Sequence, residues 1–192
     1  MKIYDISQEV FSCAVYPGDP EPQGQRLCST EAGDLYNLTA FSMCAHNGTH
    51  IDAPFHFLPG GKTVEQMDLE AFVGECYVAR FRGALGEAGA EAILAKAGGA
   101  ARVLIAGEAV VTPEGAERFA RSGIRLLGCE SQSVGPAEAP MQVHLILLGR
   151  GIALLEGIVL EGIPEGRYFL SAAPLKLAGA DGAPCRAWLM EA

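Results

Sequence analysis

The middle of the chain, residues 76–157, alternates between strand-like and helix-like segments, and this alternation restricts the fold more than any other feature. The strand-like segments are apolar: CYVARF (76–81), ARVLIAG (101–107) and IRLLGCE (124–130). Between them lie an Ala-rich stretch that ends in glycines (86–98) and a stretch that opens with Thr112 and Pro113. That pair suits an N-cap followed by proline in the first helical turn. Strands separated by helices favour parallel pairing in one sheet.

Both ends of the chain add further strands to this pattern. YNLTAFSMCA (36–45) is predicted to be a strand that leads into a cluster of histidines, and residues 143–157 are predicted to hold a helix, a turn and a short strand. Residues 167–179 and 185–190 resemble two closing strands. With 192 residues, the chain has the length of one ordinary domain. We therefore predict a single α/β domain over residues 1–192 with a mixed central sheet.

Composition excludes several classes of partner. The net charge of −9 disfavours nucleic acid, because phosphate binding depends on clustered Lys and Arg. No apolar run approaches the roughly 18–20 residues of a membrane span, and Asp5 and Glu9 interrupt any signal-peptide core. The six cysteines contain no C-x-x-C pair, so reduced thiols are expected. A cytoplasmic protein that binds a small-molecule substrate, with no nucleic acid or membrane partner, is the expectation.

Three of the four histidines fall within the stretch HNGTHIDAPFHF, residues 46–57. His46, His50, Asp52 and His56 all occupy even positions, so an extended segment would direct them to one side. Ten fully extended residues span about 33 Å, however, which is far longer than a metal site. The two ends can share one site only if the chain bends, and a glycine at 48 and a proline at 54 would permit that bend.

Imidazole and carboxylate groups together suit Zn²⁺ or Mn²⁺ better than Ca²⁺ or Mg²⁺. Histidines with purely structural roles are the alternative, and a Ser-His-Asp triad is a weaker one because no serine lies in a G-x-S-x-G context. The fourth histidine, His144, lies on an apolar helix and taken alone would be structural. Glu156 follows in an apolar run, where a buried carboxylate needs a partner such as a metal ion.

The stretch HNGTHIDAPFHF matches the H-x-G-T-H-x-D-x-P-x-H-F signature of the putative cyclase family of metal-dependent hydrolases. This family includes bacterial kynurenine formamidases and isatin hydrolase. The similarity extends to YPGDP at 16–20, to the spacing between His144 and Glu156, and to PLKLAGADGAPCRAWL at 174–189. The chain thus resembles the family over nearly its whole length.

The resemblance implies a two-metal centre, with Zn²⁺ as the expected ion and Mn²⁺ as the second choice. The implied ligands are His46, His50 and Asp52 for one ion and, with Asp52 bridging, His144 and Glu156 for the other, Glu156 touching both. His56 would stay off the metals as proton donor and acceptor. The family fold is a swivelling β/β/α domain, and its members form homodimers or higher oligomers, so a homodimer or homotetramer is expected.

The implied reaction is hydrolysis of an amide C–N bond, in an aryl formamide such as N-formylkynurenine or in a cyclic amide, by a metal-activated water. Lactone or lactam processing, or a metal-binding protein without catalysis, are the alternatives. Tyr16 replaces a tryptophan that packs against the substrate ring in kynurenine formamidases, and it is expected to bind substrate by stacking. ESQSVGP at 130–136 replaces a D-x-P-S-V-D-P pattern. Neither departure affects an implied ligand, but both leave the identity of the substrate open.

Overall fold

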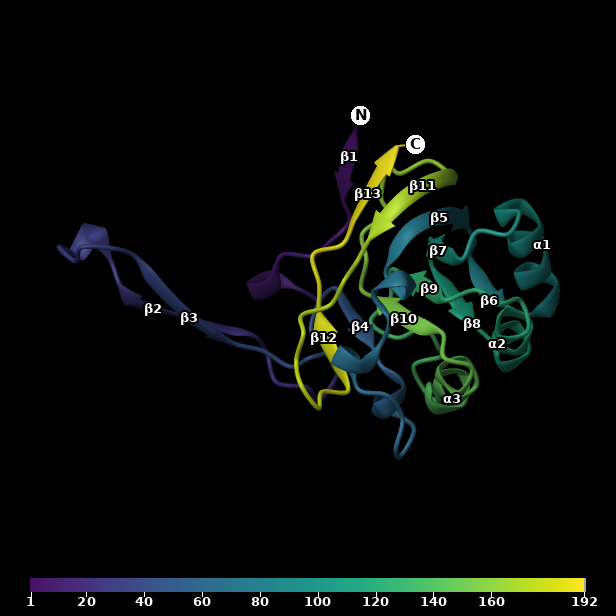
Figure 1. Ribbon diagram of the computed structural model, residues 1–192, viewed down its shortest axis with the longest axis horizontal. Helices are drawn as coiled ribbons and strands as arrows, with labels where there is room; N and C mark the ends of the chain where they lie inside the picture. Colours follow the sequence, from purple (N-terminus) through teal and green to yellow (C-terminus); the bar gives the residue numbers. More distant parts are fainter. Residues whose placement is uncertain (192) are drawn as a thin grey trace.

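One mixed sheet of nine strands, in the order β1-β13-β11-β5-β7-β9-β10-β4-β12, forms the centre of the protein in a computed structural model that describes residues 1–191 (Figure 1). Four adjacent strands run parallel: β5 (Val73–Arg80), β7 (Arg102–Ala106), β9 (Leu126–Cys129) and β10 (Ala153–Glu156). The remaining strands pair antiparallel: β1 (Ile3–Asp5), β13 (Trp188–Glu191) and β11 (Gly166–Ser171) on one side, and β4 (His50–Asp52) and β12 (Gly182–Pro184) on the other. The predicted α/β class and mixed sheet are confirmed.

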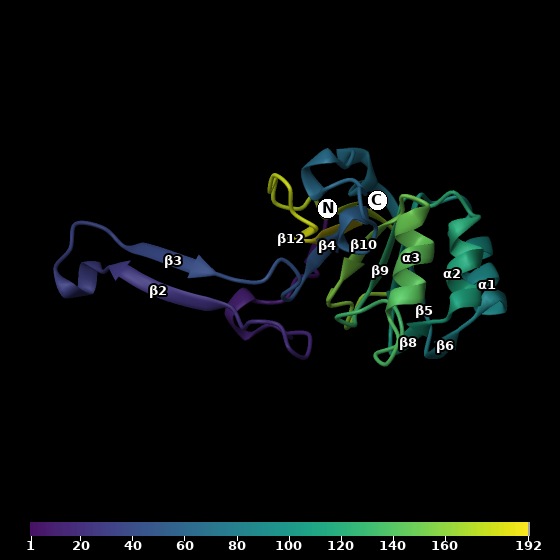
Figure 2. The same cartoon turned by 90° about the horizontal axis from the view of Figure 1, so that it is seen from below.

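Three α-helices pack on one face of the sheet: α1 (Glu87–Ala97), α2 (Pro113–Ala120) and α3 (Met141–Gly149) (Figure 2). The Thr112 hydroxyl caps α2 by accepting a hydrogen bond from the Gly115 amide, and Pro113 occupies its first turn, as predicted. Buried apolar residues of the helices and of that sheet face form one core, and a second core covers the other face. None of the helices within residues 1–191 has the length and apolarity needed to cross a bilayer.

Short elements complete the fold. β6 (Gly83–Leu85) and β8 (Ala109–Val111) form a parallel pair beside the helices. Five single 3-10 turns are η1 (Val10–Ser12), η2 (Thr30–Ala32), η3 (Pro54–His56), η4 (Val64–Gln66) and η5 (Leu69–Ala71). The strand expected over 167–179 ends at Ser171, and the extra strand β12 follows it. The residues of β12, Gly-Ala-Pro, have little strand propensity, so pairing with β4 determines this element rather than local sequence.

A two-stranded hairpin extends away from the body (Figures 1 and 2). It consists of β2 (Gln23–Cys28) and β3 (Leu38–Ser42), paired antiparallel. β3 lies within the predicted strand 36–45 and leads into the histidine segment, but neither β2 nor the projection of the hairpin was predicted. None of the residues of β2 and β3 is buried. The hairpin therefore has no core of its own.

Candidate metal centre

The histidine segment bends at the two residues predicted to allow it. Gly48 has a left-handed φ of 61°, and a 3-10 turn begins at Pro54. Asn47 closes a tight turn just before the bend, with its amide donating to the Cys44 carbonyl. As a result, the rings of His46 and His56 stack with their centroids 4.0 Å apart, although ten residues separate them. The bends bring both ends of the segment to one place.

Strand β4 carries His50 and Asp52 at the centre of this segment and lies between β10 and β12. In the β4–β10 register His50 is directly opposite Glu156, so the two side chains occupy the same face of the sheet. Ile51, of opposite parity, packs into the core on the other face. His50, Asp52 and Glu156 are each at most 2% exposed. Cross-strand pairing therefore explains how Glu156 meets residues about a hundred positions earlier.

Each of the two buried carboxylates divides its oxygens between two histidines. The Nε2 atom of His50 lies 3.4 Å from Oδ1 of Asp52 and 3.6 Å from Oε2 of Glu156. The Nε2 atom of His144 lies 3.6 Å from Oδ2 of Asp52 and 3.3 Å from Oε1 of Glu156. These distances exceed those of good hydrogen bonds. They are close to the separation of about 3.4 Å between two donors of one tetrahedral ion whose metal–ligand bonds are about 2.0–2.1 Å long.

The outward-facing nitrogens of these two imidazoles are held by backbone carbonyls. Nδ1 of His50 lies 2.9 Å from the Gly48 carbonyl oxygen, and Nδ1 of His144 lies 2.8 Å from the Pro140 carbonyl oxygen. Since a carbonyl only accepts, each Nδ1 carries the proton and each Nε2 faces the carboxylates. Metal-binding histidines in proteins usually have such an outer partner, which fixes the tautomer and the ring orientation.

His46 lies between two carboxylates. Its Nδ1 is 2.8 Å from Oδ1 of Asp52, and its Nε2 is 2.8 Å from Oδ2 of Asp181. Burial lowers the pKa of His46, but its contacts with Asp52 and Asp181 outweigh burial and raise it. Both ring nitrogens can face carboxylates only if the ring is doubly protonated or if a cation lies at one nitrogen. The site thus requires positive charge beyond its neutral imidazoles.

The pKa values of the fully buried groups reflect the same requirement. Burial lowers the pKa of His50, but Asp52 and Glu156 outweigh that effect and raise it to about 10. The pKa of Asp52 is well below its usual range, because its histidine neighbours outweigh the opposing effect of burial. Oδ2 of Asp52 nevertheless has no hydrogen-bond donor. An ionised, buried oxygen without a donor is costly, and a divalent cation would satisfy it.

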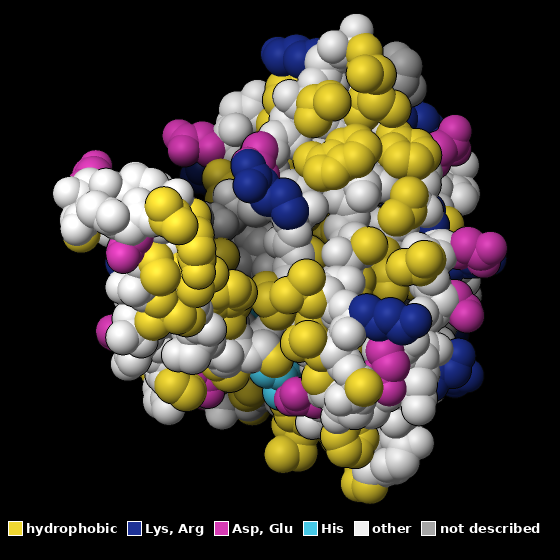
Figure 3. Space-filling model, turned by 60° about the vertical axis from the view of Figure 1, so that its left-hand side comes forward, with side chains coloured by type: hydrophobic (Ala, Val, Ile, Leu, Met, Phe, Trp, Pro, Cys, Tyr) yellow, Lys and Arg dark blue, Asp and Glu magenta, His cyan; other side chains and the backbone are white. Residues whose placement is uncertain are grey.

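A cavity of about 420 Å³ opens onto this centre and is lined by Tyr16, Phe57 and all four histidines. The His56 side chain is 27% exposed, whereas the His144 side chain is 3% exposed. In Figure 3 histidine is visible at one recess, beside acidic and apolar side chains. The centre is therefore buried below the cavity, and His56 is the most accessible of the four histidines.

The structure brings all seven predicted site residues to this cavity or to the buried centre beneath it. It also places there residues that were not predicted. Asp181 contacts both His46 and His56, and its only sequence signal was its position in the stretch 174–189 that resembles the family. Gln132 and Ser133 line the cavity from the segment 130–136, which departs from the formamidase pattern. That departure therefore falls on the cavity wall.

Thr49 supports the bend from outside the cavity. Its hydroxyl donates to the Gly157 carbonyl at 2.6 Å and accepts from the Gln8 amide at 2.9 Å. The first of these bonds joins the residue before His50 to the residue after Glu156, at the point where β4 and β10 meet. Thr49 therefore acts as a buried structural residue that fixes the two strands carrying the site.

Comparison with known proteins agrees with this geometry. A model of the Putative cyclase family matches residues 4–136. A kynurenine formamidase from Erythrobacter litoralis is 35% identical over 204 residues, covering 99% of this chain and 94% of that relative. A solved structure described as a potential metal-dependent hydrolase with cyclase activity is 31% identical, with a TM-score of 0.82 over 98% of this chain and 96% of its own.

Isatin hydrolase A from Labrenzia aggregata shares the fold, with a TM-score of 0.84 at 22% identity over 98% of this chain and 93% of its own. The fold, the relatives and the buried histidine–carboxylate cluster define the protein as a metal-dependent hydrolase with a site for a divalent metal. Within that class, the chain belongs to the Putative cyclase family.

Proposed function

We propose that the protein hydrolyses the C–N bond of a small amide, with two divalent metal ions held by the buried cluster. The favoured substrate is an aryl formamide, the class that includes N-formylkynurenine, and a cyclic amide is the alternative. The kynurenine formamidase relative, which this chain covers almost completely, supports the first choice. Zn²⁺ is the preferred ion and Mn²⁺ the second, because the donors are imidazoles and carboxylates.

The observation that carries this proposal is the division of carboxylate oxygens in the centre. Asp52 and Glu156 each present one oxygen toward His50 and the other toward His144. A single ion would use only one such side. Two ions bridged by both carboxylates would use every inward-facing donor, including the unpartnered Oδ2 of Asp52.

In this proposal the ligands form two groups. His46, His50 and Asp52 would hold one ion and His144 the other, with the carboxylates of Asp52 and Glu156 shared between them. His56 also lies within ligand distance of His46 and Asp52. We assign it instead to proton transfer, because its side chain is more exposed than those of the other three histidines and its Nδ1 is already engaged by Asp181.

When bound, the cations would lower the pKa of a water molecule and polarise the substrate carbonyl. The chain's own residues supply the rest of the chemistry. With Nδ1 of His56 donating to Asp181, its Nε2 is free to accept a proton from water as the new C–O bond forms. The same nitrogen then donates that proton to the amide nitrogen as the C–N bond breaks. Tyr16 lines the cavity, where its ring would pack against an aromatic substrate.

Metal analysis tests the centre. Purified protein loaded with Zn²⁺ or Mn²⁺ and then desalted should contain about two ions per chain. The His56→Ala protein should retain both ions while its turnover falls by roughly 10²- to 10⁴-fold, the usual contribution of general acid–base catalysis. Loss of an ion in that variant would make His56 a ligand, and persistent turnover would remove its role in proton transfer.

A substrate panel tests the reaction. N-formylkynurenine, isatin and simple lactones should be assayed with Zn²⁺ and with Mn²⁺, and metal-stripped protein is the matched control. We expect hydrolysis of the aryl formamide, measured by release of formate and the amine. Lactone opening without amide cleavage would favour the alternative activity. Absence of turnover on the whole panel in fully loaded protein would favour a binding role without catalysis.

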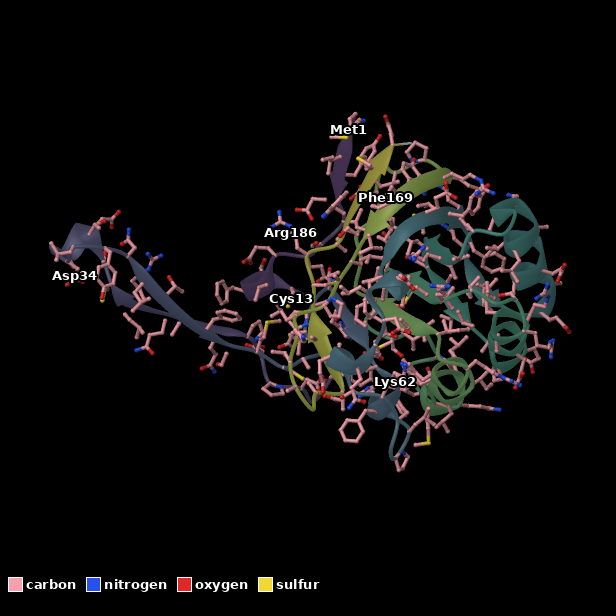
Figure 4. All side chains as sticks on the ribbon, viewed as in Figure 1. Met1, Cys13, Asp34, Lys62, Phe169 and Arg186 are labelled. Carbon is pink, nitrogen blue, oxygen red and sulfur yellow. The ribbon has the colours of Figure 1, made fainter. Side chains whose placement is uncertain are left out.

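For assembly, we propose a homodimer in which the β2–β3 hairpin packs on a second copy of the chain. A lone two-stranded hairpin is marginally stable in water, and this one has no buried residue. It nevertheless exposes apolar side chains, with Leu27 51% and Leu35 97% exposed. Figure 3 shows apolar side chains along the projecting segment, and Figure 4 places Asp34 at its far end.

The body offers a surface of matching character at the base of the hairpin. A cavity of about 650 Å³ there is lined on the body side by Val10, Ala173, Leu175 and Pro184, together with polar side chains, and on the hairpin side by Phe41. Twofold pairing, the commonest symmetry of soluble oligomers, would bury both hairpins reciprocally, and two such dimers would form the homotetramer. Light scattering should give twice the 20.2 kDa chain mass. The double variant Leu27→Lys/Leu35→Lys should be monomeric, whereas the control Leu69→Lys, outside the hairpin, should not. A monomeric native chain would refute the proposal.

A further inference from the structure

We infer that Asp181 is a positioning residue that orients two histidines at once, the proposed metal ligand His46 and the proposed proton carrier His56. Its Oδ2 atom lies 2.8 Å from Nε2 of His46 and 3.1 Å from Nδ1 of His56. An ionised carboxylate oxygen has two lone pairs and only accepts, so both ring nitrogens donate to it. One atom therefore determines the tautomer of both rings. The inference rests on the proposed function, because it explains how the residues of that site are oriented.

The consequences for the two rings are different. Protonation of His46 at Nε2 leaves its Nδ1, which is 2.8 Å from Oδ1 of Asp52, as the nitrogen that can bind a cation. This is the carboxylate–histidine–metal arrangement, whose carboxylate raises the basicity of the ligand. Protonation of His56 at Nδ1 leaves Nε2 as the nitrogen that can accept a proton. Without Asp181, Asp52 would instead favour a proton on Nδ1 of His46, and Nδ1 of His56 would lose the acceptor that holds its proton.

The fold places Asp181 with little freedom. It immediately precedes β12, and its backbone carbonyl accepts a hydrogen bond from the Ala53 amide at 2.9 Å, next to Asp52 on β4. The following residue, Gly182, lies opposite Asp52. A Cβ atom at Gly182 would be 2.8 Å from Cε1 of His46 and 2.7 Å from a β4 carbonyl oxygen, so only glycine lets the His46 ring pass.

The other imidazoles support the same interpretation. His50 and His144 each donate Nδ1 to a backbone carbonyl, so every proposed metal-binding histidine has an outer partner. Asp181 supplies that partner for His46, and it is the only charged one among the three. The stacked rings of His46 and His56, with centroids 4.0 Å apart, allow the same carboxylate to serve both.

Two alternative roles compete with this one. Asp181 could itself be a metal ligand, in which case removal of its charge would lower the number of ions bound at saturation. It could also be a surface carboxylate without a role, since its side chain is 42% exposed. A positioning role differs from both, because it predicts a full complement of metal together with altered histidine tautomers.

The test uses the full chain loaded with Zn²⁺ and the variants Asp181→Asn and Asp181→Ala. Both retain the backbone bond to the Ala53 amide. Asp68→Asn, an exposed aspartate whose side chain makes no cap hydrogen bond, is the matched control. Three quantities are measured: zinc per chain at saturation, retention of zinc against a competing chelator, and the ¹⁵N shifts of the His56 ring at about pH 8. The His56 signals are assigned by their loss in His56→Ala.

We expect saturated Asp181→Ala to contain as much zinc as the native chain but to lose one ion to the chelator about 10- to 100-fold more readily. Its His56 ring should change from the Nδ1–H tautomer toward a mixture with Nε2–H. Hydrolysis of N-formylkynurenine should lose kcat by about 10- to 100-fold, with KM changed much less. Asp181→Asn, which keeps one acceptor oxygen, should lie between Asp181→Ala and the native chain on each measure.

Two results would overturn the inference independently of any substrate. A lower zinc content at saturation would make Asp181 a ligand, and unchanged His56 tautomers with unchanged zinc retention would leave it without a role. Failure of the proposed amide hydrolysis would appear instead as inactivity of the native chain, with the metal and NMR differences still present. The two failures can therefore be told apart.

Discussion

Loading the metal centre should release protons, and the number can be worked from the charges around His50. Asp52 and Glu156 raise the pKa of His50 to about 10, against an ordinary value of 6.5, despite the opposing effect of burial. At neutral pH the metal-free protein therefore holds about one additional proton on this ring, at Nε2, beside the proton that Nδ1 already carries. The pKa values of His46 and His144 are also raised, by their carboxylate partners and against burial, and those rings add to the total. Because a metal-binding nitrogen must be unprotonated, these protons have to leave.

The same proton makes the stability of the metal-free protein depend on pH. The folded chain binds more protons at His50 than the unfolded chain does, so the free energy of unfolding falls as pH rises above 6.5 toward 10. Each pH unit in this window costs about 1.4 kcal/mol for one such group, or about 2 kcal/mol between about pH 7 and pH 8.5. The metal-loaded chain, in which Nε2 of His50 carries no proton, should not show this decrease.

Two measurements check this prediction. Calorimetric titration of Zn²⁺ into metal-free protein, repeated in buffers of different ionisation enthalpy, should give release of at least about one proton per chain. Urea unfolding at a series of pH values should give the steeper decline for the metal-free form. Buried thiols such as Cys76, whose pKa burial raises to about 12, affect both forms equally, so the difference isolates the centre. Metal binding without proton release, together with parallel stability curves, would refute the reasoning.

Further substitutions test individual parts of the site. Asp52→Asn should remove both ions, measured by elemental analysis, and a native zinc content would contradict its bridging role. Thr49→Val should lower the free energy of unfolding in urea by about 1–3 kcal/mol, because two backbone groups lose their partner, whereas the exposed control Thr39→Val should not. Tyr16→Ala should raise KM for an aryl formamide by roughly 2- to 10-fold and Tyr16→Phe should not, and equal KM values would exclude stacking. Gly182→Ala should weaken zinc retention by displacing the His46 ring. Unchanged retention would show that β12 can shift to accommodate the methyl group, and it would contradict the requirement for glycine at this position.

Local sequence predicted those elements whose structure depends on local interactions. The Ala-rich segment 86–98 became α1, and Thr112 with Pro113 began α2, because caps and helical propensity act within a few residues. The apolar strands of the parallel region were also predicted, since strands buried on both faces read as continuous apolar runs. Their ends differed from the structure by a few residues.

The elements that were missed are those that only pairing defines. β12 has little strand propensity and exists because β4 is beside it, and the projection of the β2–β3 hairpin depends on the rest of the fold. Asp181 was missed for the same reason. Its place in the family-like stretch 174–189 did not by itself assign it a role, and its position beside His46 and His56 arises from the β12–β4 register.

The sequence by itself determined the chemical character of the site. Residue types alternate along HNGTHIDAPFHF, and a glycine and a proline stand where a bend is needed. Together with the resemblance to a family, these features identified the residues that surround one cavity. Only the tertiary structure decided which atoms of these residues face one another. The β4–β10 register places Glu156 opposite His50, and the carboxylates divide their oxygens between two sides. The physical reason is that residue type and local bends are encoded within a few positions, whereas distances between strands depend on how the whole sheet assembles.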